Sequence, residues 1–385
     1  MIARGLRPWQ DFVVLDANDG PGGAWRHRWD SLTLGKAHGI ADLPGMPMGE
    51  FSPTEPSSSV VARYYGRYEA EFGLPIVRPA PVKRVSSPAG RGEGPLRVEL
   101  EHGGPREITT DLLLNATGTW DNPFVPYVKG AERFVGEQLH TVHYKRADDF
   151  AGKRTLVVGG GLSAVQFLLE LAPVTETIWA TRRPPNFTDR TFDAVWGLDV
   201  ETAVRERTQA GERPASVVRT TGIPLWEPYV EAVDEGVLVS RGMFDEITPD
   251  GVRFGSRTSN SSDGPGPAAL AEELVLPQSW QPFAPGHEES FDVIFWNTGF
   301  RASLDHLRPL GLTSERGGVE MVDEVRVAAD PRVLLVGYGS TASTIGATRA
   351  GRRAGREAAR LLRSSTRLDT DLRSYSTTKA TQMIE

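Results

Sequence analysis

Short runs of apolar residues, each bounded by polar or glycine-rich turns, recur along the chain and predict β-strands. These runs are rich in β-branched residues and are too short to be typical helices. The predicted strands lie within residues 11–17, 81–87, 96–102, 107–118, 291–300 and 332–339. A segment rich in serine and glycine, residues 256–266, predicts a surface loop.

Two segments change from a strand pattern to a helical pattern after a glycine-containing turn. Residues 153–172 contain the strand TLVV, the turn GGG and an apolar helix, and residues 332–362 repeat this order. Strands that alternate with helices in this way are typical of parallel sheets covered by helices. We therefore predict an α/β fold.

Length and composition narrow the class of protein. A chain of 385 residues is too long for a single core, which indicates two domains. The net charge of −7 argues against a nucleic-acid partner or an anionic membrane surface. We find no apolar run long enough for a membrane span and no secretory signal in residues 1–10, so we expect a cytoplasmic protein.

The sequence contains no cysteine. This excludes disulfides, thiol nucleophiles, cysteine-bound zinc and a dithiol redox pair, including the chemistry of disulfide reductases. Nothing in the sequence indicates a metal site. A redox function would therefore depend on a cofactor.

The strongest local motif is VVGGGLSA. Gly159, Gly161 and Ala164 occupy the positions of a G-x-G-x-x-A motif between a predicted strand and a predicted helix, with Leu162 and Ser163 between them. Glycines at these positions let the backbone approach a pyrophosphate, which the free N–H groups of the helix start can bind. The alternative is a glycine-rich turn that binds no ligand.

About 20 residues further on, a second strand ends at Arg182 and Arg183. A dinucleotide site for NAD carries an acidic residue at this place, whereas guanidinium groups suit the 2′-phosphate of NADPH. The pair thus favours NADPH over NADH. The alternative is two arginines that are merely solvated.

Features of a second nucleotide site surround this middle segment. Asp16 ends the first predicted strand and suits a ribose hydroxyl, and Gly22 and Gly23 form a turn that could approach a second dinucleotide. The segments DLLLNATG and DVIFWNTG, residues 111–118 and 292–299, both run from a strand into a Thr-Gly turn. Although such turns are common, two copies around a nucleotide motif indicate one domain interrupted by another.

We accordingly predict a first domain over residues 1–150 and 291–385, and a second over residues 151–290. The linker before the second domain carries the spacing F-x-G-x-x-x-H-x-x-x-Y, with Phe134, Gly136, His140 and Tyr144. Taken alone, His140 is better explained as a structural histidine than as a catalytic one.

Together these motifs resemble the class B flavoprotein monooxygenases, which include the flavin-containing and Baeyer–Villiger monooxygenases. The resemblance runs from GGAW to GYGSTASTIGATRAGR, and Tyr144 in place of tryptophan is nearer to the flavin-containing group. It implies two Rossmann-like domains, with FAD in the interrupted domain and NADPH in the inserted one. It further implies that NADPH reduces FAD and that oxygen forms a hydroperoxyflavin, which oxygenates a small organic substrate without a catalytic side chain.

The resemblance also assigns residues to the cofactors. Asp16, Gly22, Gly23 and Trp25 would contact FAD, and a helix starting near Ser340, after Gly337, would point its N-terminus at the flavin. The crossings between the domains would be Ala116, Thr117 and Gly118, and Thr298 and Gly299, with His140 and Tyr144 organising their junction. Asn297 departs from the alanine usual in the family, which predicts altered contacts at the flavin edge.

A second departure lies at the N-terminus, where the family's first strand and its glycine motif precede the segment that starts this chain. We expect that Met1 was assigned too far downstream or that the gene is truncated, and that the chain as written binds FAD weakly at best. Two other functions stay open. One is an FAD/NADPH reductase without oxygenation, and the other is an inactive remnant that binds NADPH.

Overall fold

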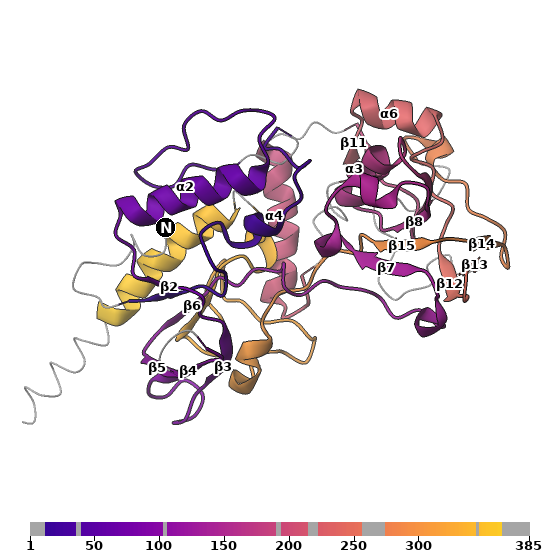
Figure 1. Cartoon of the computed structure of the whole chain (residues 1–385). Coiled ribbons are helices and arrows are strands. Elements are labelled where there is room, and N and C mark those ends of the chain that lie inside the picture. The colour runs from indigo at the N-terminus through magenta and orange to yellow at the C-terminus, as the bar shows by residue number, and fades with distance from the viewer. Residues whose placement is uncertain are drawn as a thin grey trace, which may run out of the picture.

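The computed structural model describes residues 12–35, 40–102, 106–189, 194–214, 222–255, 274–343 and 346–363. They form two α/β lobes that lie side by side (Figure 1). The predicted fold class, with Rossmann-like strand–helix units, is confirmed.

The first lobe, on the left of Figure 1, contains three small sheets. Strand β1 (Val14–Leu15) pairs in parallel with β2 (Ile76–Val77), and β6 (Leu113–Asn115) pairs in parallel with β16 (Val333–Leu335). The antiparallel sheet consists of β3 (Val82–Ser86), β4 (Leu96–Leu100) and β5 (Glu107–Thr110). Side chains from all three sheets share one apolar cluster, which joins them into a common core.

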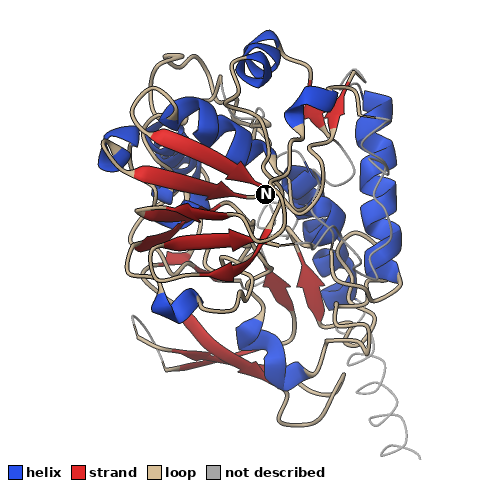
Figure 2. Cartoon of the chain, turned by 90° about the vertical axis from the view of Figure 1, so that its right-hand side faces the viewer, coloured by secondary structure: helices blue, strands red, loops and turns tan. Residues whose placement is uncertain are grey.

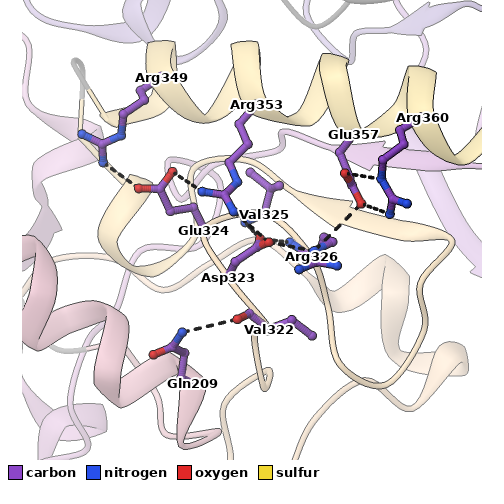
Figure 3. Close-up of polar contacts among 10 residues, drawn as sticks. All are labelled: Gln209, Val322, Asp323, Glu324, Val325, Arg326, Arg349, Arg353, Glu357 and Arg360. Atoms are coloured by element: carbon purple, nitrogen blue, oxygen red, sulfur yellow. Dashed lines mark hydrogen bonds and ion pairs between the residues drawn. The ribbon is translucent and has the colours of Figure 1, made fainter.

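Two helices of this lobe are α2 (Ser57–Glu71) and the helix over residues 346–363. The second one has buried alanines at positions 350, 354 and 358, which pack against Leu334 of β16. Arginines on its surface form ion pairs with Asp323 and Glu324 (Figure 3). Apolar packing and ion pairs therefore both attach this helix to the first lobe.

The second lobe contains a parallel sheet in the order β7, β15, β8, β9. Its strands are β7 (Glu137–His140), β15 (Val293–Trp296), β8 (Arg154–Val158) and β9 (Glu176–Ala180), and Figure 2 shows strands lying side by side in this lobe. Alternate residues of β15 enter two different clusters: Phe295 packs with Phe167 of α3 (Leu162–Leu171), and Trp296 packs with Phe244. The sheet is therefore covered on both faces, which explains why its strands are apolar throughout.

The face opposite α3 is covered by an antiparallel sheet of β12 (Phe244–Ile247), β13 (Gly251–Phe254) and β14 (Glu288–Ser290). The lobe also contains α6 (Glu227–Asp234) and the short parallel pair β10 (Phe187–Thr188) and β11 (Ile223–Pro224).

Three elements do not follow the predicted boundaries at 150/151 and 290/291. Strands β7 and β15 flank β8 in the sheet of the second lobe. Helix α4 (Ala194–Gln209), from the middle of the predicted inserted domain, lies in the first lobe (Figure 1). The amide of Met321 donates to the carbonyl of Thr208 on α4 over 3.0 Å, and Gln209 Nε2 donates to the carbonyl of Val322 over 3.3 Å. The chain thus returns to the first lobe between its two passages through the second.

Some predicted elements differ in extent. Of the strand predicted over residues 11–17, the described part forms a strand at Val14 and Leu15. The segment 107–118 forms two strands, β5 and β6, because the chain turns at residues 111–112. The loop predicted at 256–266 lies outside the described residues.

Candidate functional site

The glycine motif of the second lobe follows β8 directly. Val158 pairs with Ala180 of β9, and the indole Nε1 of Trp179 donates to the carbonyl of Gly159 over 2.7 Å. Gly159 has a φ of 144°, and a Cβ at this position would lie 2.2 Å from the carbonyl oxygen of Asn297. Only glycine fits here, because the loop packs against the end of β15.

Helix α3 starts at the end of this loop. Gly161 is its N-cap, with extended backbone, and Leu162 is its first residue. Ser163 is exposed on the first turn, whereas Ala164 is fully buried under it. The small Ala164 allows the helix to approach the sheet, and the first-turn N–H groups favour an anion. This part of the motif fits a pyrophosphate.

Arg182 and Arg183 follow β9, next to the glycine loop. Arg182 is exposed and Arg183 is half-buried. Thr181 holds this corner, since its hydroxyl bonds to the carbonyl of Arg183 at 2.6 Å and to the hydroxyl of Ser240 at 2.7 Å. No acidic residue occurs in residues 181–185. The corner therefore suits the additional phosphate of NADPH.

The two predicted crossings lie against each other. Thr117 Oγ1 donates to the carbonyl of Ser303 over 2.7 Å, and Asn122 Nδ2 donates to the carbonyl of Ala302 over 3.0 Å. The amide of Phe124 donates to the carbonyl of Gly299 over 3.0 Å, and Thr298 Oγ1 donates to the carbonyl of Phe124. Residues 117–124 and 298–303 therefore form a bonded double strap between the lobes.

Open backbone at the strand ends provides room for a ligand. Gly118 follows β6 with a φ of 63°, and Gly337 follows β16 with a φ of 80°. A Cβ at either glycine would meet nothing within 4 Å. Because β6 and β16 are parallel neighbours, both turns leave the same edge of their sheet. Ala116 and Thr117 are also exposed at this edge, as is Gly299 on the opposite strap.

The GGAW turn lies in the same lobe, over α2. A Cβ at Gly22 would come within 3.1 Å of Ala62 on α2, whereas one at Gly23 would meet nothing within 4 Å. Trp25 follows in a 3₁₀ turn over Gly23–His27 and is half-buried. Gly22 thus allows close packing, and Gly23 leaves its backbone accessible.

Asp16 already has protein partners. Its Oδ2 accepts from Arg78 Nε over 2.6 Å, and its Oδ1 accepts from the backbone and side-chain nitrogens of Asn18. Arg78 also forms a bidentate pair with Glu69. Burial alone would raise the pKa of Asp16, but the bonds from Asn18 and Arg78 outweigh it and lower this pKa. The carboxylate is ionised and fixed, and each oxygen can still accept from a ribose hydroxyl.

The F-x-G-x-x-x-H-x-x-x-Y motif forms the junction. A Cβ at Gly136 would clash with the ring of Phe134 and with the carbonyl of Asp292. His140 is buried, and its Nε2 lies 3.0 Å from the carbonyl oxygen of Gly299. The hydroxyl of Tyr144 donates to Glu170 of α3 over 2.7 Å. Each member of the motif therefore makes a contact within the protein, and none is placed for acid–base chemistry by these bonds.

Two predicted contacts are corrected by the structure. The side chain of Asn297 is buried and accepts from Thr141 Oγ1 over 3.0 Å, so it is directed into the protein and not to an open edge. Ser340 lies in a 3₁₀ turn, Gly339–Thr341, and the described α-helix covers 346–363. The turn is held against α4, because Gly339 packs on Thr208.

Sequence reasoning missed a second set of junction residues. Ser31 and Tyr144 both donate to Oε1 of Glu170, and the bond from Ser31 links the first lobe to α3. Trp29 of the first lobe packs on Phe167 of α3, with 4.7 Å between ring centroids. The sequence offers no periodic signal for these contacts, since Ser31 and Glu170 are 139 positions apart.

Within the described part of the chain, no cluster of three or more potential metal-binding side chains occurs. No helix there has the length and apolar character needed to cross a bilayer.

Comparison with known proteins gives the same picture. A model of the pyridine nucleotide-disulphide oxidoreductase family matches residues 31–216. Among curated relatives, rice indole-3-pyruvate monooxygenase YUCCA1 is 34% identical over 160 residues, which are 41% of this chain and 38% of the relative. The uncharacterized oxidoreductase CzcO of Bacillus velezensis is 30% identical, over 46% of this chain and 49% of the relative. The match thus spans less than half the length of these relatives.

Solved structures match over more of the chain. The bacillithiol disulfide reductase of Bacillus cereus has a TM-score of 0.61 but only 15% identity, which shows the fold alone. The flavin-containing monooxygenase of Stenotrophomonas maltophilia is 33% identical with a TM-score of 0.67, over 90% of both chains. A double mutant of the flavin monooxygenase from this organism is 32% identical with a TM-score of 0.69, over 92% of both chains. This likeness over nine-tenths of the chain places it in the class B flavoprotein monooxygenase family.

Proposed function

We propose that this protein is an NADPH- and FAD-dependent monooxygenase that acts on a small organic substrate. The observation that carries this proposal is the contact between the Gly159 loop and the carbonyl of Asn297. Asn297 precedes the strap that carries Gly299, and this strap is bonded to the one that carries Gly118. The two glycine-lined turns therefore belong to one junction, as a transfer of electrons between two cofactors requires.

The residues present fit both cofactors. In this proposal the second lobe holds NADPH at Gly159, Gly161 and the first turn of α3, with Arg182 on the 2′-phosphate. The first lobe holds FAD along Gly23, Gly118 and Gly337, whose backbones leave the open space described above. FAD supplies the redox chemistry when bound, since it accepts a hydride from NADPH and reacts with oxygen.

The protein's own residues position the two straps and the nucleotide loop and shield the junction from water. His140 fixes the strap at Gly299, Ser31 fixes Glu170 of α3 to the first lobe, and Tyr144 bonds to the same carboxylate from within the second lobe. Trp120 stacks on Phe300 with 5.4 Å between ring centroids, and these rings exclude water beside both straps. No side chain is assigned a proton transfer. A cytoplasmic location stays a prediction.

The test uses the full chain incubated with FAD, NADPH, labelled dioxygen and a panel of small organic substrates. A monooxygenase transfers one labelled oxygen atom to the product and consumes one NADPH per product. Hydrogen peroxide in place of a labelled product would identify a reductase without oxygenation. A protein that binds NADPH and no FAD would be the inactive remnant, and either result contradicts the proposal.

A variant at Arg182 tests the assignment of NADPH separately. Arg182→Ala removes the exposed guanidinium beside the loop, and we expect about tenfold weaker binding of NADPH with unchanged binding of NADH. The control is Arg146→Ala, because Arg146 is an exposed arginine already paired with Asp149. Equal losses for both nucleotides would contradict a 2′-phosphate contact.

A further inference from the structure

Arg28 is a half-buried cation to which the described residues offer no anionic partner. Among the residues that the structure describes, its guanidinium makes no ion pair or hydrogen bond, and its Nε is shielded from solvent. Burial lowers the pKa of Arg28 to about 10, so the side chain stays charged at neutral pH. A charge in this position is costly to bury unless another charge compensates it.

Three tryptophans surround this cation. Its guanidinium carbon lies 4.0 Å from the ring centroid of Trp120, 5.9 Å from that of Trp25 and 6.0 Å from that of Trp29. Cation–π attraction offsets part of the cost of burial. It leaves the N–H donors of the guanidinium unsatisfied, however, because an aromatic face accepts no directed pair of hydrogen bonds.

The tryptophans come from the segments that form the junction. Trp25 ends the GGAW turn, and Trp120 lies two positions after Gly118 on the first strap. Trp120 also stacks on Phe300, which follows Gly299 on the second strap. Arg28 and its aromatic neighbours therefore lie beside the turns of Gly23 and Gly118, along which the proposed function places FAD.

We propose that Arg28 is a specificity-determining residue that binds a carboxylate of the substrate, whose apolar or aromatic body packs on the tryptophans. This inference deepens the proposed function and rests on it, because the bound carboxylate is a substrate only if the protein is an enzyme. A single guanidinium among aromatic rings suits one anionic group on an apolar body. A hydrated diphosphate needs several donors, which the start of α3 and Arg182 offer elsewhere.

The test measures binding without turnover, in the full chain with and without FAD and NADP⁺. The probes are 3-phenylpropionate and its neutral amide, 3-phenylpropionamide, and the signals are tryptophan fluorescence and calorimetry. We expect the carboxylate to bind at least about tenfold more tightly than the amide and to change the tryptophan fluorescence.

Two variants of Arg28 separate charge from packing. Arg28→Met should remove the preference for the carboxylate and leave binding of the amide unchanged, whereas Arg28→Lys should keep part of the preference. The matched control is Arg301→Met, because Arg301 lies 4.0 Å over the ring of Phe124 but is exposed. The control should keep the full preference.

Folding of the variants is checked by thermal unfolding. Removing a half-buried charge that the described residues leave unpaired should leave the unfolding temperature of Arg28→Met unchanged or raise it. Equal binding of acid and amide to the wild type would overturn the proposal, as would an undiminished preference in Arg28→Met. Weaker FAD or NADP⁺ binding in Arg28→Met, with carboxylate binding intact, would assign the anion to a cofactor instead. Because no turnover is measured, these outcomes are independent of whether the protein oxygenates anything.

Discussion

His140 holds Gly299 through a hydrogen bond of 3.0 Å from its Nε2 to the carbonyl oxygen. Its Nδ1 accepts from the amide of Val142 over 3.4 Å, which leaves the proton on Nε2 and makes this nitrogen the donor. Phe300 packs edge-on against the ring, with 5.1 Å between centroids. The histidine of the motif is thus a clamp between the end of β7 and the second strap.

Replacement of His140 should lower the free energy of unfolding of the protein. His140→Ala removes a buried hydrogen bond and leaves a cavity beside Phe300, so we expect a loss of about 2–4 kcal/mol in the free energy of unfolding. Urea denaturation measures it. The control is the exposed His143→Ala, whose Nδ1 accepts from the amide of His140, and it should cost less than about 1 kcal/mol. Equal losses would show that His140 is no clamp.

Ser31 and Tyr144 share one acceptor oxygen on Glu170. We expect Ser31→Ala and Tyr144→Phe each to cost about 1–2 kcal/mol of unfolding free energy, because a hydrogen bond to a carboxylate is lost. The double variant should differ from the sum by at least about 0.5 kcal/mol, since both hydroxyls act on the same carboxylate. Ser52→Ala, at an exposed serine bonded to Thr54, is the control. Strict additivity of the two losses would contradict a shared acceptor on Glu170.

The motifs predicted part of this site for a physical reason. Gly159 and Gly299 act through backbone geometry, and His140 belongs to a motif of short spacing, so the sequence contains their signal, and the family resemblance built on them is confirmed. The hydrogen bonds to Glu170 and the contacts of Arg28 with Trp120 join segments that are distant in the chain, and a single sequence contains no pattern that predicts such contacts. The return of α4 to the first lobe was missed for the same reason.

Gly159 should tolerate no side chain. In Gly159→Ala the Cβ would lie 2.2 Å from the carbonyl of Asn297 at a φ of 144°, so the loop or β15 must move. We expect a loss of about 3 kcal/mol or more in unfolding free energy, as for other strained or overpacked sites. The neighbouring Gly160→Ala is the control, because its Cβ would lie 3.8 Å from Thr181. A similar effect of both variants would contradict the close approach.

Asp323 accepts a bond of 3.0 Å from Arg353 of the helix over residues 346–363, and further bonds from Val325 and Arg326 of its own loop (Figure 3). Burial by itself would raise the pKa of Asp323. The amides of Val325 and Arg326, the guanidinium of Arg326 and the charge of Arg353 outweigh burial and lower this pKa to about 2. The carboxylate therefore binds its proton less readily in the folded protein than in the unfolded chain, where the pKa is about 3.9.

This difference predicts how stability depends on pH. The contribution of Asp323 is complete above about pH 4 and is lost as the pH falls through about 2, because the unfolded chain then binds the proton first. We expect it to be about 1–2 kcal/mol, since water screens part of the interaction. Urea denaturation of Asp323→Asn should show this loss at pH 6 and a smaller difference from the wild type at pH 3. The exposed Asp121→Asn corrects for removal of a surface carboxylate, and a pH-independent difference after that correction would refute the anchored charge.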